Sequence, residues 1–171
     1  MQSQDTRADK NITLLLCLLS IILWAISPSQ HPWGAIYVGS TIFERATYPF
    51  FHANLIHLAL NIWVILSLVF NYGARVKHII IGYVIAVLFP VDTIYMLSRD
   101  SSLLLPTVGL SSIIFAMIGL VEPARSRRGI FYSWVFAYLI LGFILPATNG
   151  WVHLYCFSIA FALRLIVGCK I

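Results

Sequence analysis

The sequence predicts an all-α, polytopic membrane protein with six transmembrane helices in a single domain, residues 1–171. Of the 171 residues, 60% are hydrophobic and only 10% are charged, which is too apolar for an ordinary soluble domain and unlike a disordered chain. Six apolar stretches lie at 12–26, 51–70, 79–97, 103–121, 130–145 and 151–167. A spanning helix needs roughly 20 residues and tolerates about 17, so most of these stretches suffice and two are marginal.

The first stretch, 12–26, ends in Ala25-Ile26-Ser27, which also resembles a signal-peptide cleavage site. Cleavage there would leave Pro28 as the first mature residue, and Asp5 and Asp9 stand where a signal peptide is basic. We therefore expect this segment to be retained as the first span.

The positions of Lys and Arg set the orientation of the spans. Both ends and alternate loops carry nine of the eleven positive charges, namely Arg7, Lys10, Arg75, Lys77, Arg125, Arg127, Arg128, Arg164 and Lys170. The other loops carry only Arg45 and Arg99. This alternation predicts six spans with both termini cytoplasmic, and it explains the net charge of +5 without a nucleic-acid partner.

The loop at 27–49 is the longest segment between spans, and it is rich in aromatic residues and proline. It contains Pro28, Pro32, Trp33, Tyr37, Phe43 and Tyr48. Such a composition predicts a loop at the outer membrane interface, where it serves as a lipid anchor. A platform that steers a substrate towards a cleft is the alternative.

The second stretch, 51–70, contains His52, His57 and Asn61. On one continuous helix His57 and Asn61 share a face, about 40° apart, whereas His52 lies about 140° from His57. One face cannot then present both histidines to a metal, and the Glu of an H-E-x-x-H motif is missing, which argues against a metalloprotease. An aspartyl protease needs two facing carboxylates within the spans, and Asp92 in the third stretch is the only clear candidate.

The fourth stretch is interrupted by Pro106 and Gly109, so a regular helix is expected to begin only near Ser111, within a span at about 107–122. From Ser111 to Glu122 such a helix covers roughly 18 Å of a hydrocarbon core about 30 Å thick. Its first residue should therefore lie below the outer surface, where non-helical backbone is tolerated only inside protein or beside a wet cavity. Free N–H groups at this helix start would stabilise an anion.

The fifth stretch, 130–145, shows no polar motif, whereas the sixth, 151–167, contains His153 near its outer end. Ser111 and His153 are thus expected at similar depth, as a Ser–His dyad requires. Each polar residue alone is more simply a packing or interhelical hydrogen-bonding residue. Polar groups are costly in hydrocarbon, however, and together they indicate a functional site, in which His57 and Asn61 could donate hydrogen bonds to an oxyanion. The cysteines, Cys17, Cys156 and Cys169, show no metal-binding or disulfide spacing.

Three motifs resemble those of one known family. The segment His52-Ala-Asn-Leu-Ile-His57-Leu-Ala-Leu-Asn61 resembles the His…His…Asn signature in the second helix of rhomboid intramembrane serine proteases. Gly109-Leu110-Ser111-Ser112, followed by Gly119, is similar to their Gly-x-Ser-Gly nucleophile motif, and Trp151-Val152-His153 is similar to the catalytic His of their sixth helix. The motifs fall in order in the matching helices, so the resemblance covers most of the chain from about Phe43 onward.

The resemblance implies a rhomboid-like six-helix bundle of the bacterial type, which cleaves peptide bonds in or near transmembrane segments without a metal or cofactor. Ser111 would be the nucleophile and His153 the general base, with no third acidic member. Asn61 and His57 match the side chains of the family's oxyanion hole, and His52 matches the further histidine of that motif.

The chain departs from the family pattern at several positions. Phe115 stands where relatives often have a Tyr packed on the catalytic imidazole, and a Phe can still provide that packing. Ser112 replaces the Gly that follows the nucleophile. Cys156 and Ala160 replace the two glycines of the sixth helix, and because both are small, close packing should be preserved. The Trp-Arg pair of the first family loop is absent.

The expected partners are membrane-anchored substrate proteins with helix-destabilising segments, together with the lipid bilayer itself. Substrate entry would involve movement of the fifth helix and the loop from Pro146 to Gly150. The expected location is a bacterial inner membrane, with the site open to the outer side. Two alternatives are a rhomboid-like pseudoprotease that binds transmembrane helices without cutting them, and a small transporter that uses Asp92 or Glu122, although the chain has no internal repeats.

Overall fold

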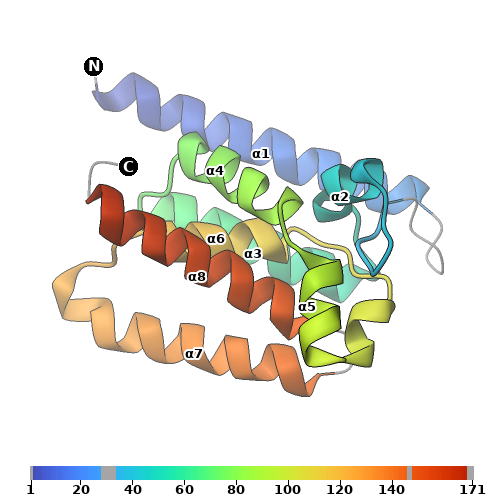
Figure 1. Cartoon of the computed structure of the whole chain (residues 1–171). Coiled ribbons are helices and arrows are strands. Elements are labelled where there is room, and N and C mark those ends of the chain that lie inside the picture. Colours follow the sequence, from blue (N-terminus) through green and yellow to red (C-terminus); the bar gives the residue numbers. More distant parts are fainter. Residues whose placement is uncertain (1, 28–33, 146–147, 169–171) are drawn as a thin grey trace.

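The computed structural model describes residues 2–27, 34–145 and 148–168, in which the longer helices surround the short helix α6, Ser111–Leu120 (Figure 1). Every α6 residue after Ser111 is buried. Helices α8 (Gly150–Val167), α4 (Val76–Val87) and α3 (Leu55–Asn71) pack on α6, while α1 (Gln2–Ile26) packs on α3 and α7 (Arg128–Ile144) packs on α8. A site at the first residue of α6 is therefore enclosed by protein.

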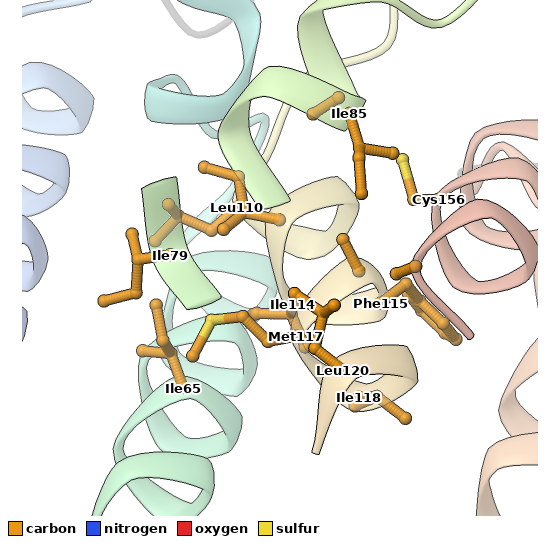
Figure 2. Packing of buried hydrophobic residues seen from close by; sticks show 14 of the residues in the cluster. Ile65, Ile79, Ile85, Leu110, Ile114, Phe115, Met117, Ile118, Leu120 and Cys156 are labelled. Carbon is orange, nitrogen blue, oxygen red and sulfur yellow. The ribbon is translucent and has the colours of Figure 1, made fainter. Parts of the chain in front are cut away.

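Helix α6 occupies the centre because its sequence is apolar on all sides and contains small residues at its closest contacts. A Cβ atom on Gly119 would lie 2.7 Å from the Phe157 carbonyl oxygen and 2.9 Å from the Ala160 Cβ in α8. A Cβ atom on Gly82 in α4 would lie 3.0 Å from the Ile113 carbonyl oxygen. Apolar side chains from α3, α4, α6 and α8 fill the remaining space, and Figure 2 shows Ile65 of α3, Ile85 of α4 and Cys156 of α8 around α6.

The close packing of α8 against α6 agrees with the expectation from the small residues of α8. Cys156 and Ala160 are both fully buried, and Ala160 faces Gly119 of α6. Gly119 of α6 thus allows the close approach of α8 at Ala160.

The outer surface of the bundle is apolar. Large hydrophobic side chains are exposed on every long helix, among them Leu15, Trp63, Ile80, Phe136 and Ile166. The segments Arg7–Ile26 and Gly150–Val167 are each long and apolar enough to cross a membrane, and bent helix pairs raise the number of such spans to four if each pair counts as one. The chain is a helical, polytopic membrane protein whose exposed apolar side chains face lipid.

The prediction of one helix over 51–70 is wrong at its beginning. Helix α3 starts at Leu55, because the side-chain oxygen of Asn54 accepts a hydrogen bond from the His57 backbone N–H at 2.8 Å and caps the helix. Before α3 lie the 3-10 turn Tyr48–Phe50 and a short non-helical connection. The helical segment Ile42–Phe50 is bent by 79° relative to α3. His52 therefore lies outside the helix that carries His57 and Asn61, and the 140° separation does not apply.

The prediction of one continuous helix over 79–97 is also wrong. Helix α4 ends at Val87 and α5 (Val91–Ser98) begins after Pro90, with a bend of 54° between them. Proline has no N–H to donate and its ring clashes with the preceding turn, so the helix breaks there.

The remaining helices follow the predicted stretches within a few residues, except at the N-terminus, where α1 begins at Gln2. In Figure 1 the N-terminal end of α1 and the C-terminal end of α8 lie on the same side of the bundle. Several residues named above lie outside the described part of the chain, namely Pro28, Pro32, Trp33, Pro146, Cys169 and Lys170.

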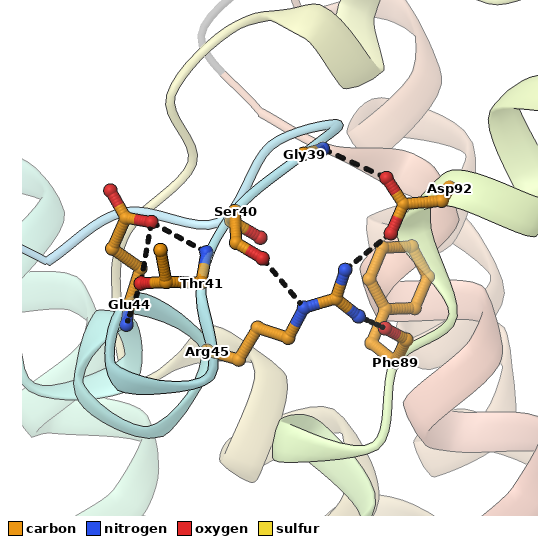
Figure 3. Close-up of polar contacts among 7 residues, drawn as sticks. All are labelled: Gly39, Ser40, Thr41, Glu44, Arg45, Phe89 and Asp92. Atoms are coloured by element: carbon orange, nitrogen blue, oxygen red, sulfur yellow. Dashed lines mark hydrogen bonds and ion pairs between the residues drawn. The ribbon is translucent and has the colours of Figure 1, made fainter.

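The first loop is attached to the bend between α4 and α5 by the polar cluster in Figure 3. Arg45, in the short helix α2 (Ile42–Thr47), forms an ion pair with Asp92 and donates to the carbonyl oxygens of Ser40 at 3.2 Å and Phe89 at 3.4 Å. Asp92 also accepts from the Gly39 N–H at 2.8 Å. The loop is thus anchored without the family's Trp-Arg pair, and Asp92 is engaged in a structural ion pair.

Candidate active site

Ser111 and His153 are brought together by the packing of α6 on α8. Ser111 is the first residue of α6 and His153 lies in the first turn of α8, and the Ser111 Oγ lies 3.0 Å from the His153 Nε2. With the imidazole protonated at Nδ1, Nε2 can accept the hydroxyl proton of Ser111. This is the contact that a serine nucleophile and its general base require.

The imidazole of His153 is held on two sides. The ring of Phe115, one turn after Ser111, stacks on it with centroids 4.3 Å apart and an angle of 17°. Gly142 of α7 lies close to the same ring, since a Cβ atom there would be 3.0 Å from Nδ1. The buried Nδ1 has no hydrogen-bond partner in the part of the chain that the structure describes. The ring orientation therefore depends on packing and on Ser111.

A cavity of about 220 Å³ lies beside this pair, with space for several water molecules. Ser111, His153 and His57 line it from the helices, and Ser102, Thr107 and Asn149 are among the residues that line it from the connecting segments. The Ser111 hydroxyl is therefore next to a space that water or an extended peptide segment could enter.

His57 and Asn61 lie next to Gly109, two residues before Ser111. Gly109 has a φ of +127°, and a Cβ atom there would lie 2.6 Å from the His57 Cε1 and 3.3 Å from the Asn61 Nδ2. Only a glycine allows this approach without strain. The Asn61 amide nitrogen is buried and has no hydrogen-bond partner among the described residues, although Asn61 itself does not line the cavity.

His52 contacts the backbone that leads to Ser111. Its Nε2 accepts a hydrogen bond from the Leu110 N–H at 3.4 Å, and its ring meets the His57 ring edge to face with centroids 5.3 Å apart. His52 does not line the cavity. Its contacts fix the positions of Leu110 and of the His57 ring.

Ser112 points into the protein. It is 1% exposed, and its hydroxyl donates to the Gly109 carbonyl oxygen at 3.4 Å. The side chain that replaces the family's glycine thus lies outside the cavity and contributes a hydrogen bond to the turn before α6.

Sequence reasoning missed the residues that hold the segment before Ser111. Thr107 pairs with Ile36 of the first loop through two backbone hydrogen bonds, Ile36 N–H to Thr107 O at 2.9 Å and Thr107 N–H to Ile36 O at 3.0 Å. Gly109 donates its N–H to the Tyr48 carbonyl oxygen at 3.0 Å. These pairings join residues that are 71 and 61 positions apart in the sequence, and no local sequence pattern specifies them.

The start of α8 is joined to the same segment. Asn149 caps α8 by accepting from the Val152 N–H at 3.2 Å, and its amide donates to the Thr107 hydroxyl at 3.1 Å. The Trp151 indole N–H donates to Asp100 at 2.8 Å. Asn directly before an apolar run is a capping signal that could have identified Asn149.

The carboxyl group of Asp100, which accepts from Trp151, has a lowered pKa. Hydrogen bonds from the Ser102 backbone N–H and then from the Trp151 indole hold the pKa of its carboxyl below the ordinary value of 3.8. The charged form of Asp100 thus stabilises the contact between the α8 start and the segment before Ser111.

The comparisons with known proteins identify the family of the chain. The family model described as Rhomboid domain matches residues 39–169, which include the second part of the first loop and the residues that line the cavity. No curated protein matches the chain. Because the matched region covers more than half of the sequence, the chain belongs to the rhomboid family, whose members are generally intramembrane proteases.

Proposed function

We propose that this rhomboid is an active intramembrane serine protease, which cleaves peptide bonds in or near the transmembrane segments of other membrane proteins. The observation that carries the proposal is the 3.0 Å contact between Ser111 Oγ and His153 Nε2 at the edge of the cavity. Phe115 stacks on the imidazole and supports the same assignment.

The reaction follows from the protonation states that this geometry allows. His153 Nε2 takes the Ser111 proton while Oγ attacks the substrate carbonyl, and a tetrahedral oxyanion forms. The C–N bond then breaks, the leaving amine takes the proton from His153, and an acyl-enzyme remains on Ser111. A water molecule from the cavity, deprotonated by His153, hydrolyses the ester and restores the hydroxyl.

The oxyanion would be stabilised by donors near Gly109 and at the start of α6. The Ser111 N–H begins the helix and has no intrahelical partner, so it can donate to the oxyanion. Asn61 offers a buried amide nitrogen without a partner among the described residues, and His57 lines the cavity. His52 we assign as a positioning residue, because its Nε2 already accepts from the Leu110 N–H.

A substrate helix has its carbonyl groups bonded internally, so it must unwind before it reaches Ser111. Substrates with Gly, Pro or other helix-destabilising residues near the cleavage site should therefore be preferred. Helix α7 is the proposed entry side, because only Phe131, Val135 and Gly142 of its residues are buried and α8 is its main packing partner. Gly150, at the start of α8, is the hinge candidate within the described residues.

We propose that both termini lie in the cytoplasm and that the cavity opens to the outer side, which the alternation of positive charge between the loops supports. In this orientation Ser111 begins α6 on the outer side. The arginine-rich turn Arg125–Arg127, which follows the other end of α6, then lies on the cytoplasmic side. A bacterial inner membrane is the proposed location.

The experiment compares cleavage of a model single-span substrate by purified wild-type protein, Ser111→Ala and His153→Ala. Cleavage by wild type and its loss in both variants is the expected result, and cleavage that persists in either variant would contradict the dyad. Labelling with a fluorophosphonate probe provides a second measurement, which should require Ser111.

Ser112→Ala is the matched control. It removes the neighbouring hydroxyl, which is buried against Gly109 and lies outside the cavity, so labelling and cleavage should continue. If wild type neither cleaves nor takes the label but binds transmembrane helices, the alternative of a pseudoprotease holds instead.

A further inference from the structure

A second cavity lies at the opposite end of α6 from Ser111. Its volume is about 350 Å³, and its floor is formed by Leu120 and Val121, the last residue of α6 and its C-cap. Arg75 and Lys77, at the start of α4, and Arg164, near the end of α8, line its walls. The proposed proteolysis uses none of these residues.

Positive charge is concentrated in this second cavity. Its lining contains three guanidinium or ammonium groups and one carboxylate, that of Glu122. Glu122 is bonded to Arg128 at 2.6 Å, so its charge is largely compensated from outside the cavity. In the described part of the chain the ion pairs involve neither Arg75 nor Lys77.

Arg164 is held in place before any ligand binds. Its guanidinium donates to the Val121 carbonyl oxygen and to the Tyr132 hydroxyl at 2.8 Å, and it lies over the Phe161 ring at 4.7 Å from the centroid. A cation fixed in this way loses little conformational freedom when it binds an anion. The carboxylate of Asp9 is engaged with the Val76 N–H at 2.9 Å and is not part of the cavity lining.

We propose that this second cavity binds a phosphate-bearing anion, either the phosphodiester of an anionic lipid headgroup or a free phosphate. A phosphate oxygen can accept several charge-assisted hydrogen bonds at once, which suits three cations around one concave site. Basic pockets between membrane helices are suited to such headgroups. The site is independent of the proposed proteolytic function, since it involves separate residues at the other end of α6.

The experiment titrates detergent-solubilised full-length protein with phosphatidylglycerol, with phosphatidylcholine and with inorganic phosphate, and measures bound ligand by native mass spectrometry. The test variant is the double substitution Arg75→Gln and Lys77→Gln. The matched control is Arg125→Gln with Arg127→Gln, which removes two exposed positive charges next to the C-terminal end of α6 but outside the cavity. Lys77→Gln alone serves if the double variant fails to fold.

Wild type and the control should bind phosphatidylglycerol in preference to phosphatidylcholine. The double variant should bind it about 25-fold more weakly, from about fivefold for each cation. Lys77→Gln alone should show about a fivefold loss. Binding of inorganic phosphate with no preference for phosphatidylglycerol, lost in the same variants, would identify free phosphate as the ligand. Equal binding by the variants and the control, or no binding of either anion by wild type, would overturn the proposal.

Discussion

Replacing Gly109 by alanine tests how the oxyanion side chains are positioned. Gly109 has a φ of +127°, and the new methyl group would lie 2.6 Å from the His57 Cε1, 2.9 Å from the His57 Nε2 and 3.3 Å from the Asn61 Nδ2. The His57 ring and the Asn61 amide would both have to move away from the turn that precedes Ser111. We expect this small substitution to affect catalysis more than stability.

Gly73 provides a control that also has a positive φ but lacks the contacts. It has a φ of +68°, and a Cβ atom there would meet nothing within 4 Å. An alanine in the left-handed region costs about 1–2 kcal/mol at either position. Gly109→Ala carries the additional displacement of His57 and Asn61, and loss of one oxyanion donor typically lowers kcat by about 10²- to 10³-fold.

The assay measures the thermal midpoint in detergent and the kcat of substrate cleavage for both variants. Both variants should have a lower midpoint than wild type, with kcat reduced on the order of 10²-fold only in Gly109→Ala. The reasoning fails if Gly109→Ala and Gly73→Ala cleave at the same rate, because His57 and Asn61 would then not contribute to the transition state.

Three further variants test the connections around the dyad. Asn149→Ala should lower the free energy of unfolding by about 2 kcal/mol, which urea titration would measure. About 1 kcal/mol comes from the lost α8 cap and about 1 kcal/mol from the lost hydrogen bond to Thr107. Gly119→Ala should cost about 1–3 kcal/mol and reduce cleavage, because its methyl group would press on the α8 backbone, whereas Gly129→Ala, with open space around it, should behave like wild type. Asp100 has a lowered pKa in the folded protein, so its contribution to stability is present above its unfolded pKa of about 3.8 and is lost as the pH falls through the folded value. The difference in thermal midpoint between wild type and Asp100→Asn, which weakens the bond to Trp151, should therefore begin to shrink as the pH falls below about 3.8 and should disappear only below the folded pKa.

The parts of this molecule that depend on local sequence could be predicted. The apolar stretches marked the helices, and Pro106 with Gly109 indicated that α6 begins near Ser111, as it does. Ser111 and His153 could be assigned to the same depth because each lies at the start of its helix. Hydrophobicity and helix-breaking residues are local properties, which explains why they sufficed.

Hydropathy alone failed where a capping residue or a proline interrupts an apolar run. In the second stretch the helix begins only after Asn54, so His52 lies outside α3. In the third stretch the helix breaks at Pro90, and Asp92 after it lies near the first loop. A capping asparagine and a proline are recognisable in the sequence, whereas the contacts that His52 and Asp92 make depend on distant segments. The hydrogen bond from Leu110 to His52 and the Arg45–Asp92 ion pair join segments far apart in the sequence.

The short length of α6 explains why so many distant contacts converge on the segment before it. Ten helical residues span roughly 15 Å, so the backbone before Ser111 lies at a depth where free polar groups are costly. The first loop satisfies part of this backbone through Ile36 and Tyr48, and the start of α8 is attached to it through Asn149. The same hydrogen bonds fix the position of Ser111 relative to His153, so satisfying the buried backbone also provides the rigidity that a serine nucleophile and its base require.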